Sequence, residues 1–193
     1  GKEAFFSTTD LVIPEGTNLV LADSCLVILK DHKLTVNGSV TVGLADGYAS
    51  MLVYQNENVT LDTSNITVDC GYLFCNSSAA LAETYFTQPN LSQLIVKEPY
   101  TLSHDLALQD DFLIDFTAGL TVDPGVTVTI PVAAQYKWRH IEFPFGGITV
   151  TGGTLTNNGT IHVEAGADIS LGEGIPFDGS GTYTGDGIWP GKE

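Results

Sequence analysis

The feature that most constrains the fold of this chain is a short unit in which a glycine separates two apolar stretches. The pattern apolar-x-x-Gly-x-x-apolar-x-apolar occurs at residues 13–21, 122–130 and 163–171. A second pattern, Leu-Thr-Val-Asn-Gly-Ser-Val-Thr-Val at residues 34–42, returns at 155–163 and more loosely at 120–128. Alternating apolar residues are typical of strands, and glycine or asparagine is typical of turns, where the backbone visits positive φ. Each unit therefore predicts a strand, a tight corner and a second strand.

The spacing of these units predicts how they are arranged. Ile13 and Val122 are 109 residues apart, and Val122 and Val163 are 41 residues apart. Both spacings are near multiples of about 20 to 22 residues, a length within the range of solenoid repeats. One unit cannot bury its own apolar row, whereas stacked coils bury a continuous column and share backbone hydrogen bonds. We therefore predict an all-β parallel β-helix, or β-solenoid, of short strands with glycine and asparagine corners.

A β-sandwich or jelly roll is the alternative, because Asn37-Gly38 and Asn158-Gly159 also fit two-residue hairpin turns. The length of 193 residues favours one domain. We expect a single elongated β domain over residues 1–193, with an irregular insertion at about 70–100. Only Ser77–Phe86 has helix-forming content, and it predicts a short helix within that insertion.

Three segments resemble the coils of right-handed parallel β-helix (β-solenoid) modules of microbial cell-surface and secreted proteins. They are residues 34–42, 152–163 and 179–187, and the resemblance covers residues 10–42 and 118–187. It implies an extracellular, elongated module with a structural or adhesive role. The resemblance brings no catalytic motif with it.

The charge of the chain excludes some partners. Seven Lys and Arg residues stand against 23 Asp and Glu residues, which gives a formal net charge of −16. Binding to phosphate backbones needs basic patches, so we expect no nucleic-acid partner. The longest apolar runs, such as Leu26–Leu29, are about four residues, far short of the roughly 20 that a membrane-spanning helix needs. We therefore expect no membrane span.

Asparagine shows an unusual pattern. Six of the nine asparagines stand in Asn-x-Ser/Thr sequences, the acceptor motif for N-glycosylation. Glycosylation would place these asparagines on the surface of a secreted chain. Asn-Gly-Thr corners in a threonine-rich solenoid produce such sequences without any modification, which leaves both explanations open. The candidate glycosylation sites are Asn37, Asn58, Asn65, Asn76, Asn90 and Asn158.

The cysteines offer a candidate disulfide, and the aspartates offer candidate metal ligands. Cys70 and Cys75 are close enough in sequence to form a local disulfide, which would leave Cys25 unpaired; three buried thiols are the other interpretation.

We predict no metal site and no cofactor, with Ca²⁺ as the one ion for which the sequence offers candidate ligands. These ligands are Asp105, Asp110, Asp111, Asp115, Asp178 and Asp186, which otherwise form a solvated acidic face.

An aromatic segment is the candidate ligand or interface site. Residues 135–145 gather Tyr136, Trp138, Phe143 and Phe145 around Arg139, the only arginine. Aromatic rings with a guanidinium suit sugar stacking or a protein interface. In the other interpretation, one face of this segment packs into the core. The sequence has no Gly-x-Ser-x-Gly elbow and no assignable carboxylate pair, so we expect no enzyme and no catalytic residue.

The N-terminal stretch predicts self-association. Ala4–Thr9 contains Phe5 and Phe6, has no charge and is poorly protected as a free strand edge. Pairing with the uncharged stretch 181–185 of another copy would be heterologous and would propagate into filaments. The resulting hypothesis is a non-enzymatic extracellular structural protein, a self-assembling or adhesive module of a cell surface, sheath or filament. A carbohydrate-binding module is the second hypothesis, and a polysaccharide-active β-helix enzyme is the third.

Overall fold

The computed structural model, which describes residues 4–138 and 141–192, is a parallel β-solenoid of about 8 turns. Strands make up 45% of the chain and helices 4%, which confirms the all-β prediction and excludes the sandwich alternative. The chain divides into two compact units: residues 1–94 with 136–143, and residues 95–135 with 144–193. The strand β10 (Gln93–Val96) spans the sequence boundary between them.

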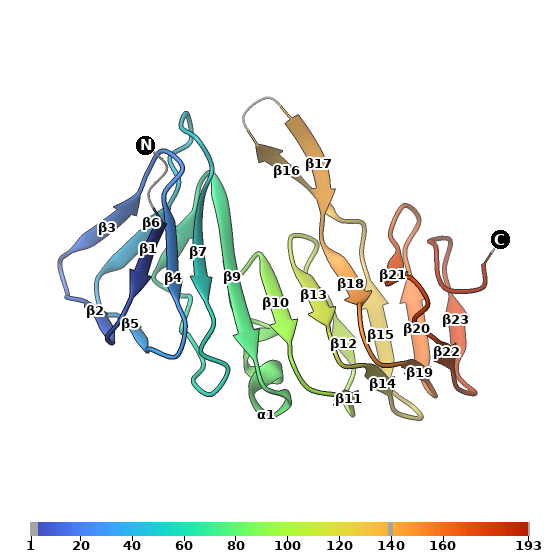
Figure 1. Cartoon of the computed structure of the whole chain (residues 1–193). Coiled ribbons are helices and arrows are strands. Elements are labelled where there is room, and N and C mark those ends of the chain that lie inside the picture. The colour runs from blue at the N-terminus through green and yellow to red at the C-terminus, as the bar shows by residue number, and fades with distance from the viewer. Residues whose placement is uncertain (1–3, 139–140, 193) are drawn as a thin grey trace. The chain divides into compact units, whose positions relative to one another are not determined.

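The N-terminal unit consists of coils whose strands stack in parallel on three faces. Figure 1 shows the first of these sheets, β1-β4-β7-β9, side by side in blue to green. Its strands are β1 (Ala4–Ser7), β4 (Leu26–Leu29), β7 (Ser50–Tyr54) and β9 (Gly71–Ser77). The second sheet pairs β2 (Leu11–Ile13) with β5 (Leu34–Val36), and the third is β3 (Asn18–Leu21), β6 (Ser39–Val42) and β8 (Ile66–Val68).

The C-terminal unit repeats the arrangement on three faces. One sheet contains β13 (Leu113–Phe116), β18 (Gly147–Val150) and β21 (Ile169–Leu171). The second contains β11 (Tyr100–Leu102), β14 (Leu120–Val122), β19 (Leu155–Asn157) and β22 (Phe177–Asp178). The third contains β12 (Leu106–Ala107), β15 (Thr127–Ile130), β20 (Thr160–Val163) and β23 (Thr182–Thr184).

Register explains why the core is continuous within each unit. Val27 pairs with Leu52, and Leu52 pairs with Leu73; all three side chains are buried. Side chains alternate between the two faces of a strand, so every second residue enters such an inward column. Paired residues are 22 positions apart for Ala4 and Leu26 and 21 for Ile148 and Ile169, within the predicted coil length. The coil between Val27 and Leu52 is longer, at 25 positions.

Two glycine positions show why the corners have their sequences. Gly16 has φ 76°, as the prediction of positive φ requires, and no atom lies near the place of its missing side chain. Gly38 does not have positive φ; a Cβ there would instead strike the backbone oxygens of Pro14 and Thr17 on the preceding coil. The Asn-Gly corners therefore need glycine because two coils approach closely there.

The predicted insertion at 70–100 is wrong for much of its range. Residues 71–77 form β9, whose residues 71–75 pair with β7. The helical part is confirmed as α1 (Ala79–Ala82) followed by the 3₁₀ turn η1 (Glu83–Tyr85). The irregular coil lies elsewhere: Leu113 pairs with Gly147, 34 positions away, because β16 (Ala134–Trp138) and β17 (Ile141–Phe145) form a two-stranded sheet of their own.

Candidate functional site

The first coil leaves its inward column uncovered. Phe5 is in register with Val27, so its side chain takes the same column as Val27 and Leu52. Val27 is 5% exposed, whereas Phe5 is 53% exposed. The difference arises because a neighbouring coil covers Val27 on each side and β1 has a hydrogen-bonded neighbour only on the β4 side in the described part of the chain. An apolar core column is thus open to solvent at this coil.

The other two strands of this coil differ from β1, because their inward residues Ile13 and Leu21 are buried. Among the described residues, β2 pairs only with β5, and β3 pairs only with β6. Val12 on β2 and Val20 on β3 are 53% and 41% exposed, and Phe6 on β1 is 53% exposed. All three face outward, in register with Thr35, Thr41 and Ile28. We call Phe5, Phe6, Val12 and Val20, with the backbone of β1, β2 and β3, the first-coil edge. The sequence analysis identified the two phenylalanines; the valines become apparent only once their strands are placed in one coil.

The last coil is covered in part by the chain itself, while Phe177 of β22, in register with the fully buried Leu155, stays 48% exposed. Residues 186–192, here called the C-terminal strap, turn back over this coil. Trp189 stacks on Tyr183 with ring centroids 6.1 Å apart, and the Lys192 ammonium lies 3.8 Å from the Trp189 centroid, a cation–π contact. Ile188 forms a parallel bridge with Asp168 beside β21. The predicted free edge at 181–185 is therefore wrong in part, because Trp189 lies over the inward side chain of β23.

The aromatic segment forms the ribbon β16–β17 instead of a solenoid strand. Arg139 lies outside the described residues, as do the side chains of Tyr136, Trp138 and Phe143. Phe145 is half-buried. The role of this segment in ligand binding or an interface stays a prediction.

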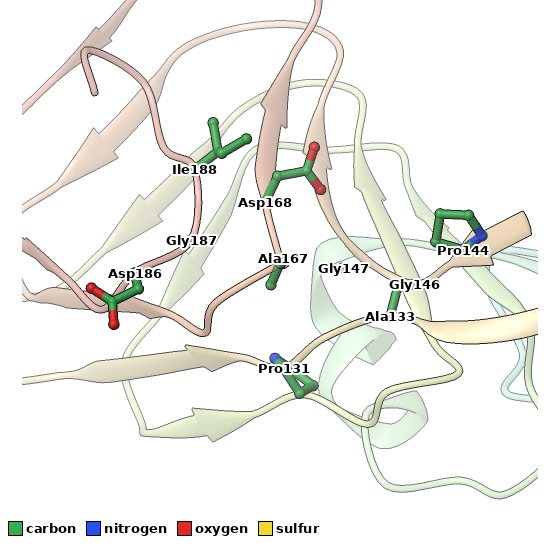
Figure 2. A pocket seen from close by; sticks show the side chains of 11 residues that line it. Pro131, Ala133, Pro144, Gly146, Gly147, Ala167, Asp168, Asp186, Gly187 and Ile188 are labelled. Atoms are coloured by element: carbon green, nitrogen blue, oxygen red, sulfur yellow. The ribbon is translucent and has the colours of Figure 1, made fainter. Parts of the chain in front are cut away.

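A pocket of about 560 Å³ lies in the C-terminal unit, beside the base of the ribbon (Figure 2). Two carboxylates, Asp168 and Asp186, stand on its wall, and Ser170 Oγ donates a hydrogen bond to Asp168 at 3.0 Å. The other lining residues are Pro131, Ala133, Pro144, Gly146, Gly147, Gly166, Ala167, Gly187 and Ile188. Among the described residues, this lining contains no aromatic side chain and no histidine, cysteine or lysine.

The candidate Ca²⁺ ligands do not converge. Asp105 accepts a hydrogen bond from the Thr127 backbone N–H at 2.7 Å, and Asp115 accepts one from Thr151 Oγ1 at 2.7 Å. These carboxylates tie neighbouring coils together. Across residues 4–138 and 141–192, no group of three or more His, Cys, Asp or Glu side chains is placed to hold a metal ion.

The Cys70–Cys75 disulfide is incompatible with this fold. All three cysteines are free thiols. Cys75 lies within β9 and Cys70 directly precedes it, so five extended residues hold them about 16 Å apart. A disulfide needs Cα atoms within about 7 Å. The sequence separation suggested a tight loop, whereas the segment is the longest strand of the described chain.

Cys75 belongs to a buried polar cluster with two tyrosines. The Tyr85 hydroxyl accepts a hydrogen bond from the Leu61 N–H at 2.8 Å, and Cys75 and Tyr54 are fully buried. Burial raises the pKa of the Cys75 thiol and of the Tyr85 phenol, and it raises the pKa of Tyr54 to about 12. A protonated, inaccessible thiol is no nucleophile, so the cluster is structural.

This cluster predicts alkaline instability. Above about pH 9 the unfolded chain releases protons from Cys75, Tyr54 and Tyr85 that the folded chain retains, so the free energy of unfolding falls as pH rises. We expect a loss of up to about 1.4 kcal/mol per pH unit for each group. Urea unfolding in reductant at pH 7, 9, 10 and 11 measures it, and Cys75→Ala should flatten the fall between pH 9 and 10. A constant free energy over this range would contradict the prediction.

The six candidate glycosylation sites differ in exposure. Asn37, Asn58, Asn65 and Asn90 are exposed, whereas Asn76 on β9 and Asn158 are half-buried. The Asn65 amide donates to the Val36 carbonyl, and the Asn158 side-chain oxygen accepts the Ser180 N–H. Asn58, Asn65 and Asn90 combine exposure with a position outside the Asn-Gly corners, so the repeat pattern does not explain them; of these, Asn65 is held by its hydrogen bond to Val36.

Comparisons with known proteins name no relative: no protein-family model, no curated protein and no solved structure matches the chain significantly. Among the described residues, no helix is long and apolar enough to cross a membrane.

Proposed function

We propose that the chain is a non-enzymatic extracellular structural module that self-associates through the first-coil edge. The observation that carries the proposal is the exposure of Phe5, a residue of the inward column, on a coil whose three strands each pair on one side only within the described part of the chain. Natural β proteins normally protect such edges with charge, proline or a covering segment. The resemblance of the coils to cell-surface β-helix modules supports the extracellular setting.

The balance of forces supports association at ordinary ionic strength. Full burial of a phenylalanine side chain stabilises by roughly 1.5–3 kcal/mol, and Phe5 and Phe6 each have about half of their surface left to bury. New backbone hydrogen bonds along β1 add to this gain. The net charge of −16 opposes contact between copies, but salt screens exposed charges beyond about 8 Å at physiological ionic strength. Association should therefore strengthen as salt increases.

Paired charge substitutions test this surface. Val20→Lys places an ammonium on the first-coil edge, and Leu44→Lys makes the same change in charge at a residue outside it; both side chains are 41% exposed. We expect the wild type and Leu44→Lys to associate alike, and Val20→Lys to associate at least ten-fold more weakly. Sedimentation equilibrium at low and high salt measures the dissociation constants. A wild-type chain that stays monomeric at high concentration and high salt would overturn the proposal.

The extracellular setting makes a separate prediction about modification. We expect N-linked glycan at Asn58 or Asn90, because both are exposed, and none at Asn76, which lies within a paired strand. Mass spectrometry of glycopeptides from the native source measures the occupancy of each site. If Asn58 and Asn90 are both unmodified, the excess of Asn-x-Ser/Thr sequences would be explained by the composition of the corners.

A further inference from the structure

We infer that the ribbon β16–β17 is an insertion in an otherwise complete coil, and that the solenoid folds without it. The inference goes beyond the proposed function, because it concerns an element outside the stacked coils. The candidate ligand or interface segment 135–145 lies within this insertion, so its role can be removed from the chain without loss of the fold.

The register of all three sheets gives the length of the insertion. Across the coil that contains the ribbon, the paired residues of the three sheets lie 34, 35 and 33 positions apart. The other coils of the C-terminal unit have separations of 20 to 22 positions. Without the twelve residues 134–145, the three separations would be 22, 23 and 21. The remaining coil would therefore match its neighbours to within one residue on every face.

The corner that holds the ribbon also has the length of the corners beside it. Two rows of register partners mark the ends of these corners; they are Ala107, Thr129 and His162, and Ile114, Ile148 and Ile169. In the coil before the ribbon, the six residues 108–113 connect the two rows, and in the coil after it the six residues 163–168 do so. Without residues 134–145, the six residues 130–133 and 146–147 would form the same connection.

The two ends of the ribbon meet at its base. The Asp110 carbonyl on the preceding coil accepts the Ala134 N–H at 2.7 Å. A Cβ on Gly146 would lie 2.5 Å from the same oxygen and 3.4 Å from the Ala133 Cβ. Figure 2 shows Ala133 beside Gly146 in the lining of the pocket. Ala133 and Gly146 are therefore close enough to be joined with little movement of the coil.

Removal of the ribbon leaves the sheets of the solenoid intact. Within the described part of the chain, β16 and β17 pair only with each other, so no solenoid strand loses a hydrogen-bonded neighbour. A two-stranded ribbon is marginally stable in water on its own and adds little to the stability of the coils. In repeat proteins, insertions of this kind form loops on one face and not part of the stacked core.

Deletion of residues 134–145 tests the inference, and deletion of residues 155–166 is the control of equal length. The control removes β19 and β20, which pair with a strand on each side. A second ribbon variant joins Ala133 to Gly146 through Gly-Gly, which keeps the coil within the 25 positions found between Val27 and Leu52. We expect both ribbon variants to keep slow amide exchange in β13 and β18, with rates changed less than about ten-fold, and the control to lose it.

The outcomes are distinct from those that test the proposed function. Loss of slow exchange in both ribbon variants would overturn the inference, because the ribbon would then belong to the folding unit. Retention in either variant supports it, since the Gly-Gly linker relieves strain at the new junction. A wild-type chain that stays monomeric would overturn the proposed self-association but not this inference, whose readout lies within one chain.

Discussion

Replacing Gly43 with alanine is expected to destabilise the N-terminal unit far more than the same change at Gly16. The two glycines have almost the same backbone conformation, with φ 77° and 76°. An L side chain in that region costs roughly 1–2 kcal/mol at either position. Their surroundings differ: a Cβ on Gly16 meets nothing, whereas a Cβ on Gly43 would overlap the carbonyl group of Cys70 on the next coil.

The backbone around Gly43 has little room to move. Its N–H donates to the Leu21 carbonyl at 2.7 Å, so the glycine is fixed between the coil before it and the coil after it. Overpacking of this kind typically costs a further 1–3 kcal/mol or so. We expect Gly43→Ala to lower the free energy of unfolding by about 2–5 kcal/mol and Gly16→Ala by about 1–2 kcal/mol. Urea unfolding of both variants beside the wild type measures the difference, and equal losses would show that the coils are not stacked as described.

These glycines also show what a sequence pattern can reveal about this fold. The apolar-x-x-Gly pattern predicted corners at Gly16 and Gly125, and both have the positive φ that the pattern implies. The Asn-Gly pattern predicted a corner at Gly38 correctly but for the wrong reason, since its constraint is the approach of the preceding coil. A local pattern reports on local backbone conformation, whereas contact between coils depends on residues about one coil apart in sequence.

The failures of the sequence analysis have the same physical origin. Cys70 and Cys75 are close in sequence, and only the pairing of β9 with β7 shows that the chain between them is extended. The ribbon β16–β17 interrupts a coil whose flanking strands still match the repeat, so the register shift to 34 positions was not visible locally. Trp189 likewise gave no signal, because its role as a cover depends on Tyr183 being the inward residue of the last coil.

Truncation of Phe116 to alanine is expected to be the most damaging change in the core of the C-terminal unit. Phe116 is fully buried in β13, in register with the fully buried Val150 of β18. Its ring also stacks on Tyr100 of β11, with centroids 5.8 Å apart, so it joins two sheets of the unit. Removing a buried phenylalanine ring loses its transfer free energy and leaves a cavity, which together cost about 3–5 kcal/mol.

Phe177→Ala is the matched control, because Phe177 is 48% exposed on β22 of the same unit. Half of its ring is already in water, and we expect its loss to cost about 1 kcal/mol. The free energies of unfolding from urea titrations of both variants give the comparison, with near-ultraviolet circular dichroism to follow packing around the remaining aromatics. The inward column of a solenoid passes through every coil of a unit. The cavity left at Phe116 should therefore also weaken the packing around Val150, its register partner on β18. Faster amide exchange in β18 for Phe116→Ala than for Phe177→Ala would show that coupling, and similar costs for the two variants would mean that Phe116 does not face a stacked core.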